Sequence, residues 1–557
     1  MKRPLGPWGQ KCSLWFQKPV VRWAAGYLAL QLCMVCLVYY WRVFYGYAGS
    51  AFKLTALCGL VATVLFAGAV YIARFAKTFA VKAALAVFLC GACFCFANPP
   101  LQAPDETVHY LRSYAISMGR LDFDHDRGYP ADVNALAEGF PGAWTNAITS
   151  YWADVDETTG EVIDGGSSAN YPIKVRGSHR EWIGLQFEEY QRLKTEDMDI
   201  WKEPVMFQIL PFLPQAAGMA LTRLFGLGAL GCLYAGRLAN LAVYAALCWL
   251  ALRNCKRYQT VFAAMMLLPL SLYLGASLSY DAMLLGLYYL TASYYCADEI
   301  RTKDLGVFFV SFVLMNAVKP WISLLWLVLP LVLPKKAWNT KIRKWQLALV
   351  SLAGALAVTL LVEWYGGAFR FNYPTIGRML GGAVNGGQQL AFVLRNIPRT
   401  IAVFLGTLYE NNFYLGQLGT FGMLDLNLPV VGMASLLVLC LGTALSVHEK
   451  SSLSPRSAVG LGALALCYIG GVMGALYITY TPVGMVRVLG VQARYLLPAF
   501  LMLFVLVSAL LSHVLEPRLS GGGKALRLQL WVSGSTAAIS AALLAQHYFI
   551  GPAYVMP

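Results

Sequence analysis

The sequence has little charge for its length. Only 13% of its 557 residues are charged, whereas 58% are hydrophobic. A water-soluble domain of this size needs a more polar surface, so the composition excludes an ordinary soluble protein. Apolar stretches of about 20 residues, the length that crosses a bilayer, recur along the chain. We therefore predict an all-α membrane protein with many spans.

Acidic residues are scarce outside one segment. Residues 99–203 hold 19 of the 28 acids but only nine of the 43 Lys and Arg residues. The other basic residues gather in short connectors between apolar runs, such as Arg253, Lys256 and Arg257. This distribution is the positive-inside pattern of membrane proteins, in which basic residues mark cytoplasmic loops. A nucleic-acid partner would require one continuous basic face, so we expect none.

Motifs for soluble cofactors are also missing. The 13 cysteines all lie outside the acidic segment, mostly in apolar runs, without zinc-site spacing. The stretch Ser520-Gly-Gly-Gly-Lys524 lacks the first glycine and the spacing of a phosphate-binding loop. Nothing in the sequence indicates a nucleotide-binding fold. A transferase that acts outside the cell has no nucleotide sugar available, so it would need a lipid-linked donor.

Hydropathy divides the chain into about 13 spans in the cell membrane. The first apolar run, from about Trp23 to Tyr45, is too long for a cleaved signal and predicts a cytoplasmic N-terminus. The last span leaves the C-terminus outside. The predicted parts are two additional N-terminal transmembrane helices (1–82) and a transmembrane core (83–547), which includes an acidic extracytoplasmic loop (98–203), a juxtamembrane helix (204–226) and a second outer segment (365–427).

Polar residues stand together where the third span leaves the membrane. Asp105 and Glu106 are adjacent, and neighbouring carboxylates at an interface raise each other's pKa, which suits proton transfer or cation binding. Asp105, His109 and Arg112 are spaced i, i+4, i+7, so one helical face would present all three. The alternative is that Asp105 caps the helix that follows Pro104.

Two further ionisable residues are predicted at the same outer face. Asp281 lies in a tight hairpin between two apolar runs, where an ionisable group indicates function unless it is a solvated hairpin tip. Lys319 precedes Pro320 between two short apolar runs. Its side chain either reaches a buried phosphate or extends to the membrane surface.

The stretch Gln492-Ala-Arg494-Tyr495 opens the twelfth predicted span from the outside. An arginine at that depth suits a lipid phosphate, because its planar group donates two parallel hydrogen bonds. The alternative is an ion pair of Arg494 with Asp105 or Asp281.

Six stretches carry a resemblance to a known family. They are Ala103-Pro-Asp-Glu-Thr-Val-His-Tyr-Leu-Arg-Ser-Tyr-Ala-Ile-Ser-Met-Gly119, Gly236-Arg-Leu-Ala-Asn240, Leu268-Pro-Leu-Ser-Leu272 with Ser277-Leu-Ser-Tyr-Asp281, Lys319-Pro320, Gly419-Thr-Phe-Gly-Met-Leu-Asp425 and Gly490-Val-Gln-Ala-Arg-Tyr-Leu-Leu-Pro498. Over about residues 83–545 the chain resembles the domain of unknown function 2142 family of bacterial multi-pass membrane proteins. These proteins in turn resemble the GT-C superfamily of glycosyltransferases.

The resemblance implies a GT-C-like helix bundle and roles for particular residues. Asp105 and Glu106 would be the catalytic residues. Asp105 would be the base that deprotonates the acceptor hydroxyl, and Glu106 or Asp281 would orient it or bind a metal. Arg494 or Lys319 would hold the departing lipid phosphate. The candidate substrate-binding residues are His109, Arg112, Arg237, Asp281, Lys319, Asp425, Gln492, Arg494 and Tyr495. A divalent cation, Mg²⁺ or Mn²⁺, is left open, with Asp105, Glu106 and Asp281 as its candidate ligands.

We therefore expect an inverting glycosyltransferase with a polyprenyl-phosphate sugar donor. Its acceptor would be a glycan or lipid of the cell envelope, on the extracytoplasmic face, and the surrounding membrane lipid its other partner. The alternative is a transporter or flippase of lipid-linked glycans. That function favours polar residues through the middle of the membrane and repeated halves, which the sequence does not show.

Overall fold

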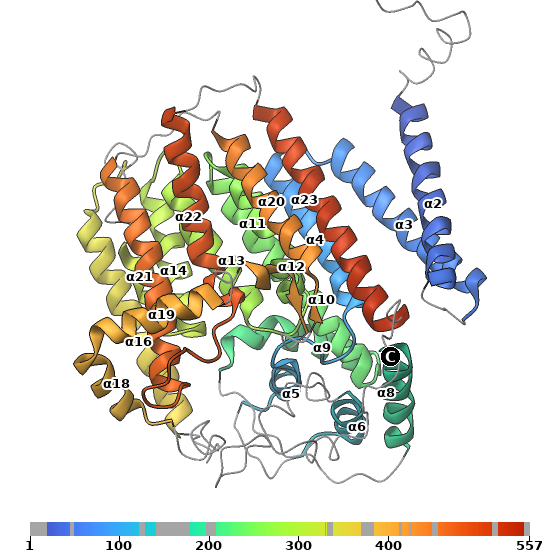
Figure 1. Ribbon diagram of the computed structural model, residues 1–557, viewed down its shortest axis with the longest axis horizontal. Coiled ribbons are helices and arrows are strands. Elements are labelled where there is room, and N and C mark those ends of the chain that lie inside the picture. Colours follow the sequence, from blue (N-terminus) through green and yellow to red (C-terminus); the bar gives the residue numbers. More distant parts are fainter. Residues whose placement is uncertain are drawn as a thin grey trace, which may run out of the picture.

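The chain forms a bundle of long helices with shorter helices gathered at one end (Figure 1). This computed structural model describes residues 19–44, 49–121, 128–140, 179–195, 208–328, 330, 338–368, 384–410, 415–422, 426–447, 455–514 and 522–550. Helix is the dominant regular structure in these ranges, because a bilayer leaves backbone groups to be satisfied within each spanning segment. The predicted all-α polytopic membrane fold is confirmed.

Nine helices in the described ranges are long and apolar enough to cross a membrane. They are α2 (Pro19–Phe44), α3 (Ala51–Arg74), α4 (Phe79–Ala97), α10 (Ala229–Asn254), α16 (Lys344–Ala368), α20 (Pro429–Ser446), α21 (Pro455–Thr479), α22 (Ala493–Val514) and α23 (Gly522–Ala545). A tenth would be added by α18 (Gly386–Arg395) and α19 (Ile397–Glu410), if this pair, bent by 107°, counts as one span.

The larger predicted count of about 13 includes runs that form shorter helices. The run from Thr260 to Leu278 is divided into α11 (Gln259–Met266) and α12 (Pro269–Gly275). Pro269 stands at the start of α12, because proline has no N–H to continue α11. The next runs form α13 (Asp281–Ser293), α14 (Thr302–Val318) and η5 (Ile322–Leu327). The number of spans therefore stays a prediction.

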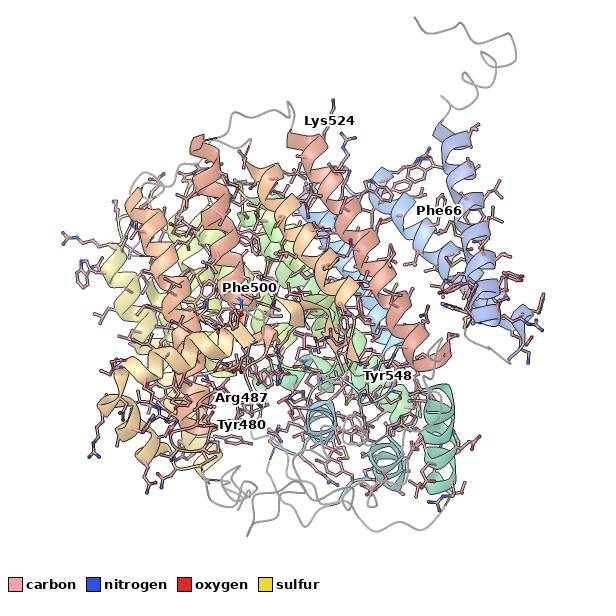
Figure 2. The ribbon with its side chains drawn as sticks, in the orientation of Figure 1. Phe66, Tyr480, Arg487, Phe500, Lys524 and Tyr548 are labelled. Atoms are coloured by element: carbon pink, nitrogen blue, oxygen red, sulfur yellow. The ribbon has the colours of Figure 1, made fainter. Side chains whose placement is uncertain are left out.

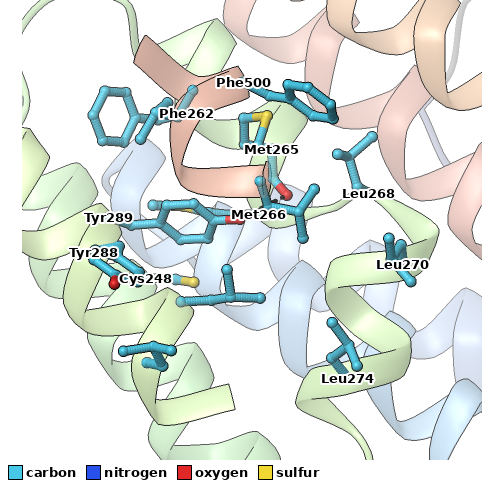
Figure 3. Packing of buried hydrophobic residues seen from close by; sticks show 14 of the residues in the cluster. Cys248, Phe262, Met265, Met266, Leu268, Leu270, Leu274, Tyr288, Tyr289 and Phe500 are labelled. Atoms are coloured by element: carbon cyan, nitrogen blue, oxygen red, sulfur yellow. Dashed lines mark hydrogen bonds between the residues drawn. The ribbon is translucent and has the colours of Figure 1, made fainter. Parts of the chain in front are cut away.

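The short helices α11 to α13 form the centre of the apolar core. Phe262 and Met266 of α11 lie beside Tyr289 of α13 and Phe500 of α22 (Figure 3). Helix α10 packs against α4, α9 (Leu213–Leu224) and α13. Because α11 to α13 are enclosed on all sides, they are apolar around their whole circumference. This packing fixes where each of these helices ends.

The described helices of the acidic loop lie at one end of the bundle. Helices α5 (Glu106–Ser117), α6 (Ala131–Gly139) and α8 (His179–Lys194) lie together there, beneath α9 (Figure 1). Helix α9 corresponds to the predicted juxtamembrane helix. It has 12 residues, buries Gln215 and Met219, and exposes Leu221 and Leu224, as an interfacial helix does.

The segment between α21 and α22 lies at the same end. Tyr480 and Arg487 mark this segment, whereas Lys524 at the start of α23 marks the opposite end (Figure 2). Close by, η8 (Gly416–Gly419) leads into a two-stranded sheet of β1 (Thr420–Phe421) and β2 (Leu426–Asn427). Gly419 permits this fold, because a Cβ there would come within 2.3 Å of the Leu428 carbonyl oxygen.

Helices α2 and α3 form a hairpin beside the core (Figure 1). Polar side chains join the two helices, since Gln31 donates to the hydroxyl of Thr63 at 3.0 Å and to the carbonyl of Gly59 at 3.1 Å. The hairpin contacts the end of the chain through Trp41, which donates to Gln546 at 2.8 Å. Its remaining surface is largely apolar and exposed, as expected for helices that face lipid.

Candidate functional site

Asp105 follows α4 and precedes α5, in a strained backbone conformation. Its φ of 58° lies in the left-handed region, which Asp tolerates better than most residues. Asp105 stands at the N-cap position of α5, as the predicted alternative has it, but its side chain makes no capping hydrogen bond to that helix. The side chain is 50% exposed and turns toward another helix. Backbone strain of this kind concentrates at functional sites.

The partner of Asp105 is Arg494, the second residue of α22. Its Nη2 lies 3.2 Å from Asp105 Oδ2, and its Nη1 lies 3.3 Å from Asp281 Oδ2. Arg494 is 8% exposed, and Asp281 is 5% exposed at the first residue of α13. Two carboxylates and one guanidinium, distant in sequence, thus meet at one end of the bundle. The structure therefore contains the predicted alternative, in which Arg494 forms ion pairs with these acids.

Tyr495 and Lys319 complete this cluster. Arg494 Nη2 donates to the Tyr495 hydroxyl at 2.9 Å, and Lys319 Nζ lies 4.2 Å from the centre of the Tyr495 ring. A cation over an aromatic face is attracted by the ring's electron density. Lys319 directly follows α14 and is half-buried. We call Asp105, Asp281, Lys319, Arg494 and Tyr495 the polar cluster.

The polar cluster holds Asp105 ionised. Burial alone would raise the pKa of Asp105, but Arg494, together with His109 and Lys319, outweighs it and holds that pKa below its usual range. A carboxylate in this state is a weak base for as long as Arg494 remains beside it. If Arg494 pairs with another anion instead, the pKa of Asp105 rises and Asp105 becomes a stronger proton acceptor.

His109 lies in α5, one turn beyond Asp105. Its ring is 1% exposed and packs between Phe212 and Tyr280, with ring centres 5.4 and 5.3 Å away. Burial lowers the pKa of His109, although Asp105 and Asp281 act in the opposite direction. Within the described part of the chain, neither ring nitrogen has a hydrogen-bond partner.

Glu106 belongs to a separate and fully closed ion pair. Arg237 of α10 donates to its two carboxylate oxygens at 2.8 and 2.6 Å, and both side chains are 0% exposed. The Glu106 oxygens also accept from the backbone N–H groups of Ala103 and Leu278. The guanidinium of Arg237 donates further to the carbonyls of Cys95, Asn98 and Pro99.

This pair changes the interpretation of two predicted site residues. Glu106 and Arg237 satisfy each other and fasten the chain on both sides of Asp105, so the geometry makes them positioning residues. The predicted catalytic role of Glu106 and the predicted substrate contact of Arg237 do not fit such a closed pair. The sequence places Glu106 beside Asp105, but the two carboxylates point to different partners.

Asn240, one turn beyond Arg237 on α10, positions Asp281. Its amide donates to the carbonyls of Ser277 and Ser279 at 2.8 and 2.9 Å. The hydroxyl of Ser279 then accepts from the backbone N–H of Asp281 at 3.1 Å. The predicted alternative of a solvated hairpin tip is wrong for Asp281, because the turn is buried. Asn240 ends the stretch Gly236–Asn240 that carries the family resemblance, but no role was predicted for it.

Arg112 and Asp425 are not brought into the polar cluster by the described structure. Arg112 is buried in α5, and its Nε donates to the carbonyl of Gln208 at 3.0 Å, in the segment that leads to α9. Asp425 lies outside the described residues. Both therefore remain predictions as substrate-binding residues.

Gln492 lines a narrow cleft beside Arg494. The cleft is formed by Pro104, Leu270, Tyr273, Leu274, Gln417, Thr420, Gly422, Gln492, Ala493 and Arg494. Gln417 accepts from the backbone N–H of Ala493 at 2.8 Å and so fixes the start of α22. The Tyr273 hydroxyl accepts from the N–H of Gly422 at 3.1 Å. Neither Gln417 nor Tyr273 was predicted, because nothing in their local sequence distinguishes them from core residues.

The candidate metal ligands do not form one site. Within the described ranges, no group of three or more His, Cys, Asp or Glu side chains is arranged to hold a metal ion. Both oxygens of Glu106 are occupied by Arg237 and backbone N–H groups, while Asp105 and Asp281 share Arg494. These residues do not fit the predicted Mg²⁺ or Mn²⁺ set.

The fold and the polar cluster together define a polytopic helical membrane protein with a charged site at one end of its bundle. Residues 88–503 match the family described as predicted membrane protein (DUF2142), and the chain belongs to this family. The predicted family is therefore confirmed, whereas the likeness to GT-C glycosyltransferases stays a prediction. The chain matches no curated protein and no solved structure.

Proposed function

We propose that this protein is a membrane glycosyltransferase of GT-C type. It would move a sugar from a polyprenyl-phosphate donor to a glycan or lipid of the cell envelope, with inversion at the anomeric carbon. The reaction would take place at the end of the bundle that carries α5, on the outer face of the cell membrane. The predicted orientation, with the N-terminus in the cytoplasm and the C-terminus outside, belongs to this proposal.

The observation that carries the proposal is the double ion pair of Arg494. Its guanidinium joins Asp105 and Asp281, which come from different parts of the chain. A buried guanidinium beside the buried carboxylate of Asp281 is costly to assemble, because both charges lose most of their hydration. Buried charge of this kind in a membrane protein points to function rather than stability.

The cluster supplies the groups that glycosyl transfer needs. When the donor phosphate binds Arg494 and Lys319, Asp105 loses its partner and becomes a better base. Asp105 then takes the proton of the acceptor hydroxyl, whose oxygen attacks the anomeric carbon. The bond from that carbon to the phosphate oxygen breaks, and its electron pair leaves with the polyprenyl phosphate. Arg494 and Lys319 stabilise the charge of this leaving group.

The position of the cluster supports a transferase over a transporter. Asp105 precedes α5, Asp281 begins α13, Lys319 follows α14 and Arg494 lies in the first turn of α22. Because α4 and α22 are long enough to span the membrane, the cluster lies beyond the end of α4 and at the start of α22, and not halfway along these helices. A flippase of lipid-linked glycans, the alternative function, favours polar groups halfway along the spanning helices.

Genetic complementation tests the proposal. A strain without this gene should lose one sugar from an envelope glycan or lipid, and the wild-type gene should restore it. Asp105→Asn should not restore the sugar, since a carboxamide cannot accept the proton. The matched control is Asp298→Asn, because Asp298 is 61% exposed and pairs with Arg257 away from the cluster. Full restoration by Asp105→Asn at wild-type protein level would overturn the proposal.

A further inference from the structure

The bent helix pair α18–α19 exposes an unusually apolar surface. The exposed side chains are Leu390, Leu394, Ile397, Ile401, Leu405 and Tyr409, each between 44% and 76% exposed. The opposite faces of the two helices bury Gln389, Thr400, Val403 and Thr407. Two short helices that are apolar on one face and polar on the other are typical of elements that lie in a membrane interface.

The orientation of α19 agrees with an interfacial position. It runs crosswise to α21 and α22 instead of parallel to them (Figure 1). The sharp bend between α18 and α19 falls at Asn396, whose side chain donates to the carbonyl of Phe392 at 2.9 Å and ends the first helix. The pair therefore follows the end of the bundle, where lipid headgroups meet acyl chains.

Basic residues surround the bend. Arg395 ends α18, and Arg399 lies in the first turn of α19, where its guanidinium stands 5.4 Å from the centre of the Phe392 ring. Both are exposed, as is Arg487 on the neighbouring segment, which lies at the same end of the bundle (Figure 2). Across α18, α19 and residues 480–492, the only acidic residue is Glu410, at the far end of α19.

We propose that α18–α19 binds a membrane lipid with a phosphate-bearing, anionic headgroup. Arg395 and Arg399 contact the phosphate, and the lipid chain lies along the exposed apolar face of α19. The charge decides the class of lipid, because three exposed arginines attract an anion and arginine donates two hydrogen bonds to one phosphate. This binding surface is independent of whether the polar cluster transfers a sugar.

Hydrogen bonds join α18–α19 to the segment that precedes Arg494 of the polar cluster. Gln389 of α18 accepts from the N–H of Gly484 at 2.8 Å, and Thr407 of α19 accepts from the N–H of Val488 at 3.0 Å. Gly484 and Val488 belong to the segment that continues directly into Arg494. A bound lipid that holds α18–α19 in place thereby also restricts this segment.

Native mass spectrometry of the purified full-length protein tests lipid binding. The probes are phosphatidylglycerol, which is anionic, and phosphatidylcholine, which has no net charge. Wild type should retain phosphatidylglycerol preferentially, and Arg395→Gln/Arg399→Gln should weaken that affinity about tenfold. Lys524→Gln/Arg527→Gln is the matched control, because it removes two exposed charges at the opposite end of the bundle. That control should retain wild-type affinity.

Three lipid-binding results would each overturn the inference. These are equal retention of the two lipids by wild type, unchanged affinity in the α18–α19 variant, and an equal loss in the control. A dimer that Ile401→Asn dissociates would also overturn it, since a second copy would then cover the apolar face. Hydrogen exchange separately tests the connection between α18–α19 and the segment that leads to Arg494. Phosphatidylglycerol should slow hydrogen exchange in residues 481–492 of wild type, and Thr407→Val should abolish this slowing without loss of lipid.

Discussion

Arg494 reaches Asp105 with one terminal nitrogen and Asp281 with the other, at 3.2 and 3.3 Å. Its two acidic partners stand 389 and 213 positions earlier in the chain. One guanidinium therefore joins the start of α5, the start of α13 and the start of α22. A lipid phosphate that binds Arg494 must compete with both carboxylates.

Replacement of Arg494 tests this geometry. Lysine keeps the positive charge, but its single nitrogen cannot reach both carboxylates as the guanidinium does. We expect Arg494→Lys to lower envelope sugar transfer by roughly tenfold or more, in line with the loss of one charge-assisted hydrogen bond. Transfer is measured in membranes with labelled lipid-linked sugar. Arg527→Lys, an exposed site on α23, is the control and should leave transfer unchanged.

The Glu106–Arg237 pair should matter for stability. Glu106→Gln leaves a buried guanidinium without its charge partner, and breaking a fully buried pair costs about 3–5 kcal/mol. Thermal unfolding of the purified protein should show this loss. Glu106→Gln/Arg237→Met should recover part of it, because the double variant no longer buries an uncompensated charge. Equal stability of Glu106→Gln and wild type would contradict the positioning role.

The ion pair of Asp105 should make stability depend on pH. The pKa of Asp105 is lowered in the folded protein, so this pair stabilises the fold above the pKa of the unfolded chain, about 3.9. The contribution is lost as the pH falls through the lowered value. The difference in melting temperature between wild type and Asp105→Asn should therefore shrink below about pH 4. A difference that grows in acid would contradict this assignment.

Replacement of Asn240 should lower sugar transfer, because Asn240 holds the turn that positions Asp281. Asn240→Ala removes both hydrogen bonds that hold the turn before Asp281. Each buried carbonyl left without a partner costs about 1–3 kcal/mol, and Asp281 would lose its fixed position beside Arg494. We expect lower kcat with little change in donor KM, measured in the same transfer assay. The control is Asn254→Ala, since Asn254 lies at the other end of α10 and donates to Ser293 there.

The convergence of Asp105, Asp281 and Arg494 was predictable from hydropathy and charge. Each of these residues borders an apolar run, and the positive-inside rule assigns those borders to one side of the membrane. The long helices were predictable because their apolar runs are long enough to cross a bilayer. The broken run that becomes α11 and α12 was harder, because a short apolar stretch has the same composition whether it spans the membrane or packs inside the core.

That Asp105 and Glu106 pair with different arginines could not be predicted from the sequence. Their adjacency in sequence suggests one shared role, but Asp105 precedes α5 in a left-handed conformation, whereas Glu106 is the first residue of that helix. Asp105 faces α22, whereas Glu106 faces α10 and Arg237. The direction of each side chain depends on the left-handed backbone at Asp105, which sequence patterns do not reveal. Tertiary packing decides which carboxylate remains accessible.

Cleavage of a polyprenyl-phosphate sugar by the purified full-length protein tests the central claim most directly. In vesicles that contain the donor and envelope acceptors, wild type should release polyprenyl phosphate as the acceptor is glycosylated. Asp105→Asn should slow this release by about 10²–10⁴-fold, the usual contribution of a general base, while Asp298→Asn keeps the wild-type rate. Movement of the donor across the membrane without cleavage, or equal rates in Asp105→Asn and wild type, would contradict the account.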